Sequence, residues 1–455
     1  ADDAGATEAH ARIDGDAFVF EHNGEDFTEE HFASLCRFGY SNKRALHTIG
    51  FRGIGFKSTF SLGDKVELYT PTLSVGFDRT RFTEPFWIDQ KKVANGGTTV
   101  RVEILDQHRK TEVQKNLEDW TKSPVSLLFF KNIRKIRIGE ELIHWVSCGE
   151  GPVKGSQWLA QHDNLDEKFL LARSEPEDFP AEALDEIRQE RLLSTEQEME
   201  FPPCQIEIVI GVEGRLFVVL PTGVETELPF AINASFIQDP TRFKIKSPSV
   251  SPTNRWLLER AGKLAADVLK NWLQRPDLPL SDRAKAYDAM PDVDRKKTSL
   301  DSACGTLVEE SFEAEIAEAA IALTEDGNCV DSKEAVLLPH EIYDVWPQKQ
   351  AIGFFDEASR PAIAMAVSAT NLEKLKHWNV IEEIEPQAIL RCLQDRHLPQ
   401  PKTWQNLLAL WAYVGGLLQS YRYFADRSAL KIVPAQGKSV LFSSSEVVRL
   451  GEQKI

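Results

Sequence analysis

Cysteine is scarce in this chain, and the cysteines that it has are scattered. The 455 residues contain six of them: Cys36, Cys148, Cys204, Cys304, Cys329 and Cys392. No two have the spacing C-x-x-C, which argues against a disulfide framework or a zinc site as the organising feature. We therefore expect a reducing, cytoplasmic environment.

Long apolar runs and an excess of positive charge are also missing. No apolar run is long enough to span a bilayer, so we expect neither a transmembrane helix nor a membrane partner. Lys and Arg number 53 against 70 Asp and Glu, a net charge of −17. This balance argues against a surface that coats nucleic acid, although a local basic patch stays open.

The chain begins with Ala1 rather than methionine, and the string Ala-Asp-Asp-Ala-Gly-Ala follows immediately. We expect the start to be truncated, so a targeting peptide cannot be judged. The length is enough for two or three domains, and the hydrophobic fraction of 42% is ordinary for a globular protein.

Glycine is concentrated in one short stretch. Residues 50–58 read Gly-Phe-Arg-Gly-Ile-Gly-Phe-Lys-Ser, just before a short apolar run. Glycine lets the backbone approach a ligand closely, and a loop that opens a helix presents unpaired N–H groups to an anion. Taken alone, the string fits a phosphate-binding loop and a tight turn equally well.

The region around this loop has the pattern of a two-layer α/β sandwich. Thr28 is placed to cap a helix that ends near Gly39, and a short helix is expected at 56–62. The expected strands are 17–21, 65–70, 73–77 and 98–105. We assign residues 1–110 to this first domain.

The rest of the chain divides at a segment rich in proline and charge. An α/β middle domain is expected over 111–275, with strands at 125–130, 135–138, 205–212, 216–220 and 230–236 and helices at 111–122, 181–193 and 254–274. Residues 276–299 are predicted to be a linker. A mainly helical C-terminal region then covers 300–455, with helices at 309–323, 370–375, 386–393 and 404–419.

Four short stretches, 1–4, 22–27, 50–58 and 97–100, follow one another in an order that resembles the GHKL ATPase superfamily. This group includes the ninety-kilodalton heat-shock chaperone, the MutL repair proteins, histidine kinases and sacsin. Residues 217–222, 228–236 and 241–242 resemble the segment after the ATPase domain in sacsin-like proteins. The resemblance covers about 1–275 and implies an α+β fold, with a Bergerat-type ATP-binding domain first.

The resemblance also implies positions for ATP and Mg²⁺. The positions in the glycine loop that would surround the phosphates are Gly50, Arg52, Gly53, Ile54, Gly55 and Phe56. Lys57 would contact a phosphate or point to solvent. Ser41 and Lys43 would lie in a lid over the nucleotide or in an ordinary polar loop.

The adenine end of the implied site departs from the family pattern. His22 replaces the aspartate that reads adenine; its neutral imidazole could accept a hydrogen bond from the adenine amino group, or recognition could shift to Asn23 beside Gly24. Asp26 stands where the pattern has a third glycine. Thr98 would bond near the adenine through water, or is a strand residue chosen for its β-propensity.

Two further positions of the chain, Asp3 and Arg242, bear on hydrolysis. Asp3 would lie near the nucleotide, or is a solvated carboxylate at a helix end. Arg242 would stabilise charge on the γ-phosphate as a catalytic residue, or is a surface arginine beside Lys244 and Lys246. The resemblance places the Mg²⁺-binding asparagine and the general-base glutamate upstream of Ala1.

We therefore predict an ATP-binding, slowly hydrolysing conformational switch that acts on a protein partner or client, with a homodimer as one assembly that the resemblance implies. A nucleotide sensor without turnover is one alternative. A MutL-like nucleic-acid partner is another, with a basic patch at Lys131, Arg134, Lys135 and Arg137, but the net charge of −17 argues against it.

Overall fold

The computed structural model describes residues 1–37, 55–91, 96–122, 124–190, 201–239, 243–420 and 427–448. The chain separates into two compact units, Ala1–Ala266 with Pro291–Glu313 and Asp267–Met290 with Ala314–Ile455. It is a mixed α/β protein with a large mixed sheet, in agreement with the α+β class predicted from the sequence.

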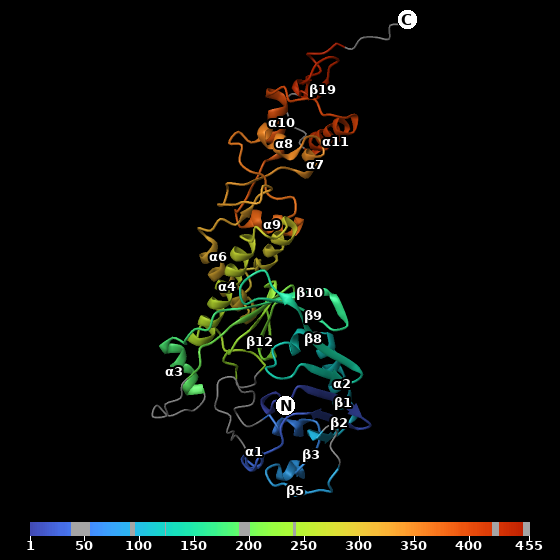
Figure 1. The fold of residues 1–455 in the computed structure, drawn as a ribbon, viewed down its shortest axis with the longest axis vertical. Helices are drawn as coiled ribbons and strands as arrows, with labels where there is room; N and C mark the ends of the chain where they lie inside the picture. The colour runs from blue at the N-terminus through green and yellow to red at the C-terminus, as the bar shows by residue number, and fades with distance from the viewer. Residues whose placement is uncertain are drawn as a thin grey trace. The chain divides into compact units, whose positions relative to one another are not determined.

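Within the described residues, 14 strands of the first unit form one sheet (Figure 1). Their order across the sheet is β13-β12-β14-β11-β10-β9-β8-β7-β1-β2-β6-β3-β4-β5. The strands are β1 (Glu8–Asp14), β2 (Ala17–His22), β3 (Lys65–Tyr69), β4 (Ser74–Asp78), β5 (Phe86–Trp87), β6 (Thr98–Glu103), β7 (Lys135–Ile138), β8 (Glu141–Glu150), β9 (Gln157–Gln161), β10 (Asn164–Arg173), β11 (Glu207–Ile210), β12 (Arg215–Val218), β13 (Leu220–Glu225) and β14 (Phe230–Asn233). The β1–β7 and β12–β14 pairs are parallel. Because β1 pairs with β7, the sheet continues across residue 110, the predicted end of the first domain.

The first unit also contains helical segments, the last two of which continue into the second unit. They are η1 (Asp2–Ala4), α1 (Glu29–Leu35), η2 (Lys57–Ser61), η3 (Arg79–Arg81), α2 (Gln107–Lys122), η5 (Pro124–Leu127), α3 (Ala181–Glu190), α4 (Pro252–Leu273) and α6 (Leu300–Ile316). Phe32 of α1 and Phe56 before η2 join a hydrophobic cluster with Val66, Phe77 and Val102. These contacts define the inner face of β3, β4 and β6, the face on which α1 and η2 lie.

The second unit is mainly helical. Its elements are α5 (Leu280–Arg283), η6 (Ala284–Ala289), β15 (Ala322–Leu323), β16 (Cys329–Val330), β17 (Val336–Leu337), α7 (His340–Tyr343), α8 (Gln348–Phe355), α9 (Ala369–His377), β18 (Glu382–Glu383), α10 (Pro386–Asp395), α11 (Trp404–Ser420), η7 (Arg427–Ala429), β19 (Val433–Pro434) and β20 (Leu441–Phe442). Trp346, Leu390 and Leu410 belong to its core. Within the predicted linker, Tyr287 is fully buried and its hydroxyl donates to the carbonyl of Ile321 at 2.6 Å.

Several local predictions are confirmed. The Thr28 hydroxyl accepts a hydrogen bond from the His31 amide at 3.2 Å, so Thr28 caps α1. The predicted strand at 17–21 is β2, and the amphipathic pattern at 254–274 corresponds to α4. In each case a strong periodicity or cap lies within the element itself.

Other predictions are wrong. The apolar run at 125–130 begins as the 3₁₀ turn η5 rather than a strand. The periodicity of so short an apolar run does not distinguish a strand from a helical turn. Residues 309–323 are not one helix, since α6 ends at Ile316 and Ala322 starts a strand. Strands β8 and β10 were missed because much of each is exposed and their apolar alternation is weak.

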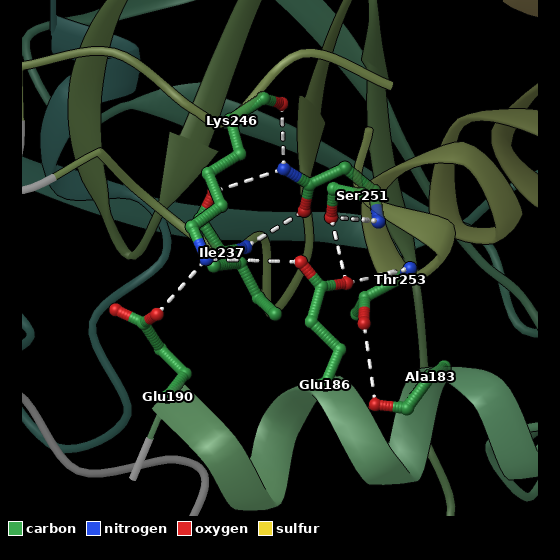
Figure 2. Close-up of polar contacts among 8 residues, drawn as sticks. Ala183, Glu186, Glu190, Ile237, Lys246, Ser251 and Thr253 are labelled. Atoms are coloured by element: carbon green, nitrogen blue, oxygen red, sulfur yellow. Dashed lines mark hydrogen bonds and ion pairs between the residues drawn. The ribbon is translucent and has the colours of Figure 1, made fainter. Parts of the chain in front are cut away.

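Buried polar side chains fix the segment that leads from β14 into α4. The Asn254 amide accepts from the Ile237 backbone N–H at 2.7 Å and donates to the carbonyls of Ile237 and Lys246, both at 2.9 Å. Figure 2 shows Glu186 and Glu190, both on α3, directed toward this segment. The Lys246 ammonium lies 3.0 Å from Glu190 and 3.8 Å from Glu186.

We predict that Asn254→Ala destabilises the first unit strongly. Asn254 is fully buried, and its loss leaves the Ile237 backbone N–H and the Lys246 carbonyl without a partner, whereas the Ile237 carbonyl still accepts from the Lys246 amide. Each unpaired group costs about 1–3 kcal/mol, so urea unfolding should show a loss of about 2 kcal/mol or more. The control is Asn271→Ala, an exposed position on the same helix, for which we expect a change below about 0.5 kcal/mol. Equal effects of the two substitutions would contradict the assignment.

Candidate functional site

A row of polar side chains crosses the inner face of the sheet where β2 ends and β6 begins. His22 and Thr98 are direct partners in the antiparallel β2–β6 ladder, so their side chains share one face. Phe20 and Val100 form the next pair on this face of the ladder, and Val100 packs against the cluster that includes Phe32 of α1. Thr70 follows β3, and strand alternation from Leu68 places it on the same face. We call His22, Thr98 and Thr70 the polar row.

Thr98 carries the least expected feature of this row. Its side chain is 2% exposed, and its hydroxyl has no hydrogen-bond partner among the described residues. A buried hydroxyl normally finds a partner, and leaving one unsatisfied costs about 1–3 kcal/mol. The unpaired group therefore calls for a water or a ligand atom.

The His22 imidazole is neutral and already uses one nitrogen. Its Nδ1 lies 3.1 Å from the Gly24 backbone N–H, which donates to it. Burial lowers the pKa of His22 to about 4, so the ring carries no charge at neutral pH. The remaining nitrogen, Nε2, therefore holds the proton and is a donor, whereas we expected an acceptor for the adenine amino group. Together with Asn23, His22 also lines a cavity of about 330 Å³.

The loop after β2 is held against the start of the chain. The Asn23 side-chain oxygen accepts from the backbone N–H groups of Thr7 and Glu8, both at 2.9 Å. Gly24 is buried, and a Cβ there would lie 2.8 Å from the Ala4 carbonyl oxygen. The Glu25 amide donates to that same carbonyl at 2.8 Å. The Asn23 oxygen is thus committed to β1.

The two aspartates at the start of the chain differ. The Asp2 carboxylate is buried and accepts from the backbone N–H groups of Lys131, Asn132 and Ile133, at 3.1, 2.7 and 3.1 Å. Asp3, the predicted nucleotide neighbour, is exposed. Asp2 therefore joins η1 to the segment before β7, a role that the sequence did not reveal.

Asp26 has a defined role in place of the expected glycine. Its carboxylate accepts from the Thr72 hydroxyl at 2.8 Å and from the Phe27 amide at 2.7 Å. Burial acts to raise its pKa, but hydrogen bonds from Thr70, Thr72 and Phe27 outweigh this and lower the pKa. Asp26 is thus ionised beside the polar row. Its link to Thr70 was missed, although Thr70 ends a strand that was predicted.

The glycine loop is described from Gly55 onward. A Cβ at Gly55 would meet no atom within 4 Å, and the Phe56 ring packs edge-on against Phe77 at 5.3 Å. The Lys57 ammonium donates to the Phe82 carbonyl and lies 4.7 Å from the centre of the Phe77 ring. Burial lowers the pKa of Lys57. Its ammonium is engaged here, so a phosphate contact would require it to leave these partners.

Seven predicted site residues lie outside the described part of the chain. They are Ser41, Lys43, Gly50, Arg52, Gly53, Ile54 and Arg242. Within that part, no group of three His, Cys, Asp or Glu side chains is placed to hold a metal ion.

The basic residues considered for nucleic acid are largely engaged with the protein. The Lys135 ammonium lies 3.2 Å from Glu8. The Arg134 guanidinium donates to the carbonyl of Lys131 at 2.7 Å, and Arg137 donates to that of Glu140 at 3.3 Å. The Glu8 carboxylate offsets the charge of Lys135, whereas the two arginines keep their charge but use some of their donors within the protein.

Comparison with known proteins gives little guidance. No protein-family model matches the chain, and no curated protein matches it. Among solved structures, the N-terminal domain of a DNA repair protein aligns with a TM-score of 0.30 and 12% identity, over 54% of this chain and 84% of that one. None of the helices described is long and apolar enough to cross a membrane.

We predict a pH dependence of stability that comes from His22. Its pKa is 6.5 in the unfolded chain and about 4 when folded. Between these values the unfolded state binds the extra proton, so stability is lost as pH falls from 6.5 to about 4. This pKa shift corresponds to about 3 kcal/mol of unfolding free energy. Because the imidazole is partly exposed and solvent screens it, we expect roughly half of that value.

Urea unfolding of wild type and His22→Gln over this pH range isolates that contribution. The difference in unfolding free energy between the two proteins should change by about 1–2 kcal/mol. His108→Gln, at an exposed position of α2, should follow wild type at every pH. Parallel curves for wild type and His22→Gln would show that burial of the imidazole does not affect stability.

Proposed function

We propose that this protein is an ATP-binding, slowly hydrolysing conformational switch of the GHKL type, similar to sacsin-like proteins. The observation that carries the proposal is the buried, unpaired Thr98 hydroxyl opposite the neutral His22. The resemblance implies that these two positions meet at the adenine, and they are partners in one ladder.

The chemistry of the polar row suits a purine. His22 Nε2–H can donate to a ring nitrogen, and the Thr98 hydroxyl can bond to the base directly or through water. Gly24 and Gly97 keep the neighbouring backbone free of side chains. Asp26 accepts hydrogen bonds from Thr70, which belongs to the row, and from Thr72 next to it.

The glycine loop suits the other end of an elongated ligand. Phe77, which Phe56 and Lys57 contact, pairs with Val66, and Thr70 lies four residues further along the strand. At about 3.3 Å per residue, the separation along β3 is roughly 13 Å. Under the proposal, backbone N–H groups of Gly53 to Phe56 bind the phosphates, Mg²⁺ arrives with them, Ser41 and Lys43 belong to the lid, and Arg242 stabilises charge on the γ-phosphate.

We predict opposite effects of Thr98→Val on the free and the ATP-bound protein. Without ligand, the isosteric change removes an unpaired buried hydroxyl, so stability should be unchanged or rise by up to about 1 kcal/mol. ATP with Mg²⁺ at about 100 times its dissociation constant should stabilise wild type by about 2.7 kcal/mol, and a tenfold weaker variant by only about 1.4 kcal/mol.

The matched control for this test is Thr99→Val, because Thr99 pairs with Glu21 and Tyr69 on the outer face of the sheet. It should keep the full stabilisation by ATP. Thermal unfolding of the full-length chain is the measurement. Absence of any stabilisation of wild type by ATP would refute the proposed function.

Gly55→Ala tests the phosphate end separately. A Cβ at Gly55 would meet no atom of the described residues within 4 Å, so we expect stability without ligand to change by less than about 1 kcal/mol. Crowding of the phosphates should remove most of the stabilisation by ATP but leave that by adenosine, which has no phosphate. The control is Gly353→Ala, at an equally open position in α8, which should change neither the stabilisation by ATP nor that by adenosine. Undiminished stabilisation by ATP in Gly55→Ala would place the phosphates elsewhere.

A further inference from the structure

A second cavity, of about 920 Å³, lies in the first unit away from the polar row. Its walls include residues of strands β8 to β14 and of helix α3. The volume falls in the range of roughly 300–1,000 Å³ that is usual for small-molecule sites. One side is apolar and includes Leu159, Leu171 and Val218.

A chain of polar contacts crosses one wall of this cavity. Arg173 Nε lies 2.8 Å from one carboxylate oxygen of Glu207, and the Asn233 side chain donates to the other at 2.9 Å. The Asn233 side-chain oxygen accepts from the Val219 backbone N–H, also at 2.9 Å. All four residues line the cavity. Both Glu207 oxygens and both ends of the Asn233 amide are therefore used within the wall.

Arg173 is the member of this chain with unused donors. Among the residues that the structure describes, none accepts from its two terminal nitrogens, and its side chain is 36% exposed. Of the other charged residues of the lining, Asp2 accepts three backbone N–H groups, Glu190 pairs with Lys246 and Arg134 donates to the Lys131 carbonyl. Lys131 also lines the cavity and adds positive charge to it. A guanidinium with a free edge is suited to a planar carboxylate.

Val219 adds an independent sign of a ligand site. Its φ of 60° lies in the left-handed region, which a β-branched residue rarely adopts. Such strain costs about 1–3 kcal/mol and is found preferentially at ligand-binding positions. Asn233 holds the strained backbone in place, so the polar chain fixes Val219 and Arg173 relative to each other.

We propose that this cavity binds an amphipathic carboxylate, a molecule with one carboxylate group on an aliphatic or aromatic body. The Arg173 guanidinium binds the carboxylate, and the apolar side formed by Leu159, Leu171 and Val218 receives the body. Helix α3 closes the site, since Ile187 and Glu190 line it and Glu190 is tied to Lys246 (Figure 2). The inference does not depend on nucleotide binding.

The probe for the test is dansyl-labelled undecanoate, a fluorescent carboxylate, titrated into the full-length chain. We expect saturable fluorescence enhancement and displacement by decanoate. Decanol, which has the same chain length but no carboxylate, should displace at least about tenfold less effectively, because it cannot pair with the guanidinium. Equal displacement by decanol, or no saturable binding, overturns the proposal without any variant.

Two variants locate the carboxylate. Arg173→Gln should raise the dissociation constant of the probe about tenfold, while Lys168→Gln, an exposed charge on the same strand outside the cavity, should leave it unchanged. Circular dichroism checks the fold. If Arg173→Gln does not fold, Arg173→Lys is used instead. The lysine keeps a positive charge beside Glu207 but lacks the second hydrogen-bonding edge of the guanidinium, so binding should weaken about fivefold. Wild-type affinity in the folded variant overturns the assignment.

Discussion

The close approach of Gly97 to the end of β2 is the constraint on which the candidate site depends. A Cβ at Gly97 would lie 1.8 Å from the His22 carbonyl oxygen and 2.8 Å from the Asn23 Cα, both of them backbone atoms. No side chain fits there, and the backbone could not yield without breaking the ladder. Because β6 starts at this contact, Thr98 is fixed opposite His22. A slip of one residue would turn Thr98 to the outer face.

The polar groups of the first unit follow two different patterns. Asp2, Asn254 and Glu207 each join segments far apart in the sequence, and their carboxylate or amide atoms are bonded to the protein. Their burial is thereby compensated, and they hold the fold together. The Thr98 hydroxyl and the outer edge of Arg173 are left open instead. An unmade hydrogen bond in a buried place is costly, so a partner for the Thr98 hydroxyl would recover that free energy. The Arg173 guanidinium is more exposed, and a ligand there would replace water.

A structural feature could be predicted from the sequence where its cause lies within a few neighbouring residues. The cap at Thr28 and the apolar stripe of α4 are encoded within a few turns, and both were predicted. The surroundings of Lys57 were not, because Phe56, Phe77 and Phe82 come together only in the folded chain.

The same reasoning applies to the candidate sites. Gly97 and Thr98 could be identified as candidate site residues from the order of the short stretches along the chain. The tautomer of His22 could not, because it depends on a hydrogen bond from the Gly24 amide. The second cavity left no signal at all. Arg173, Glu207 and Asn233 meet across three strands, one of them the partly exposed β10 that was missed.

The short helix η1 connects the surroundings of the two candidate sites. Its Ala4 carbonyl accepts from Glu25 in the loop after His22, while its Asp2 carboxylate binds the backbone at 131–133. Asp2, Lys131 and Ile133 all line the larger cavity. A displacement of η1 would therefore strain contacts at both places, whichever site it began from. Coupling of this kind requires that η1 have two arrangements and that each ligand bind one of them more tightly. The coupling free energy cannot exceed the difference between a ligand's binding free energies for the two arrangements.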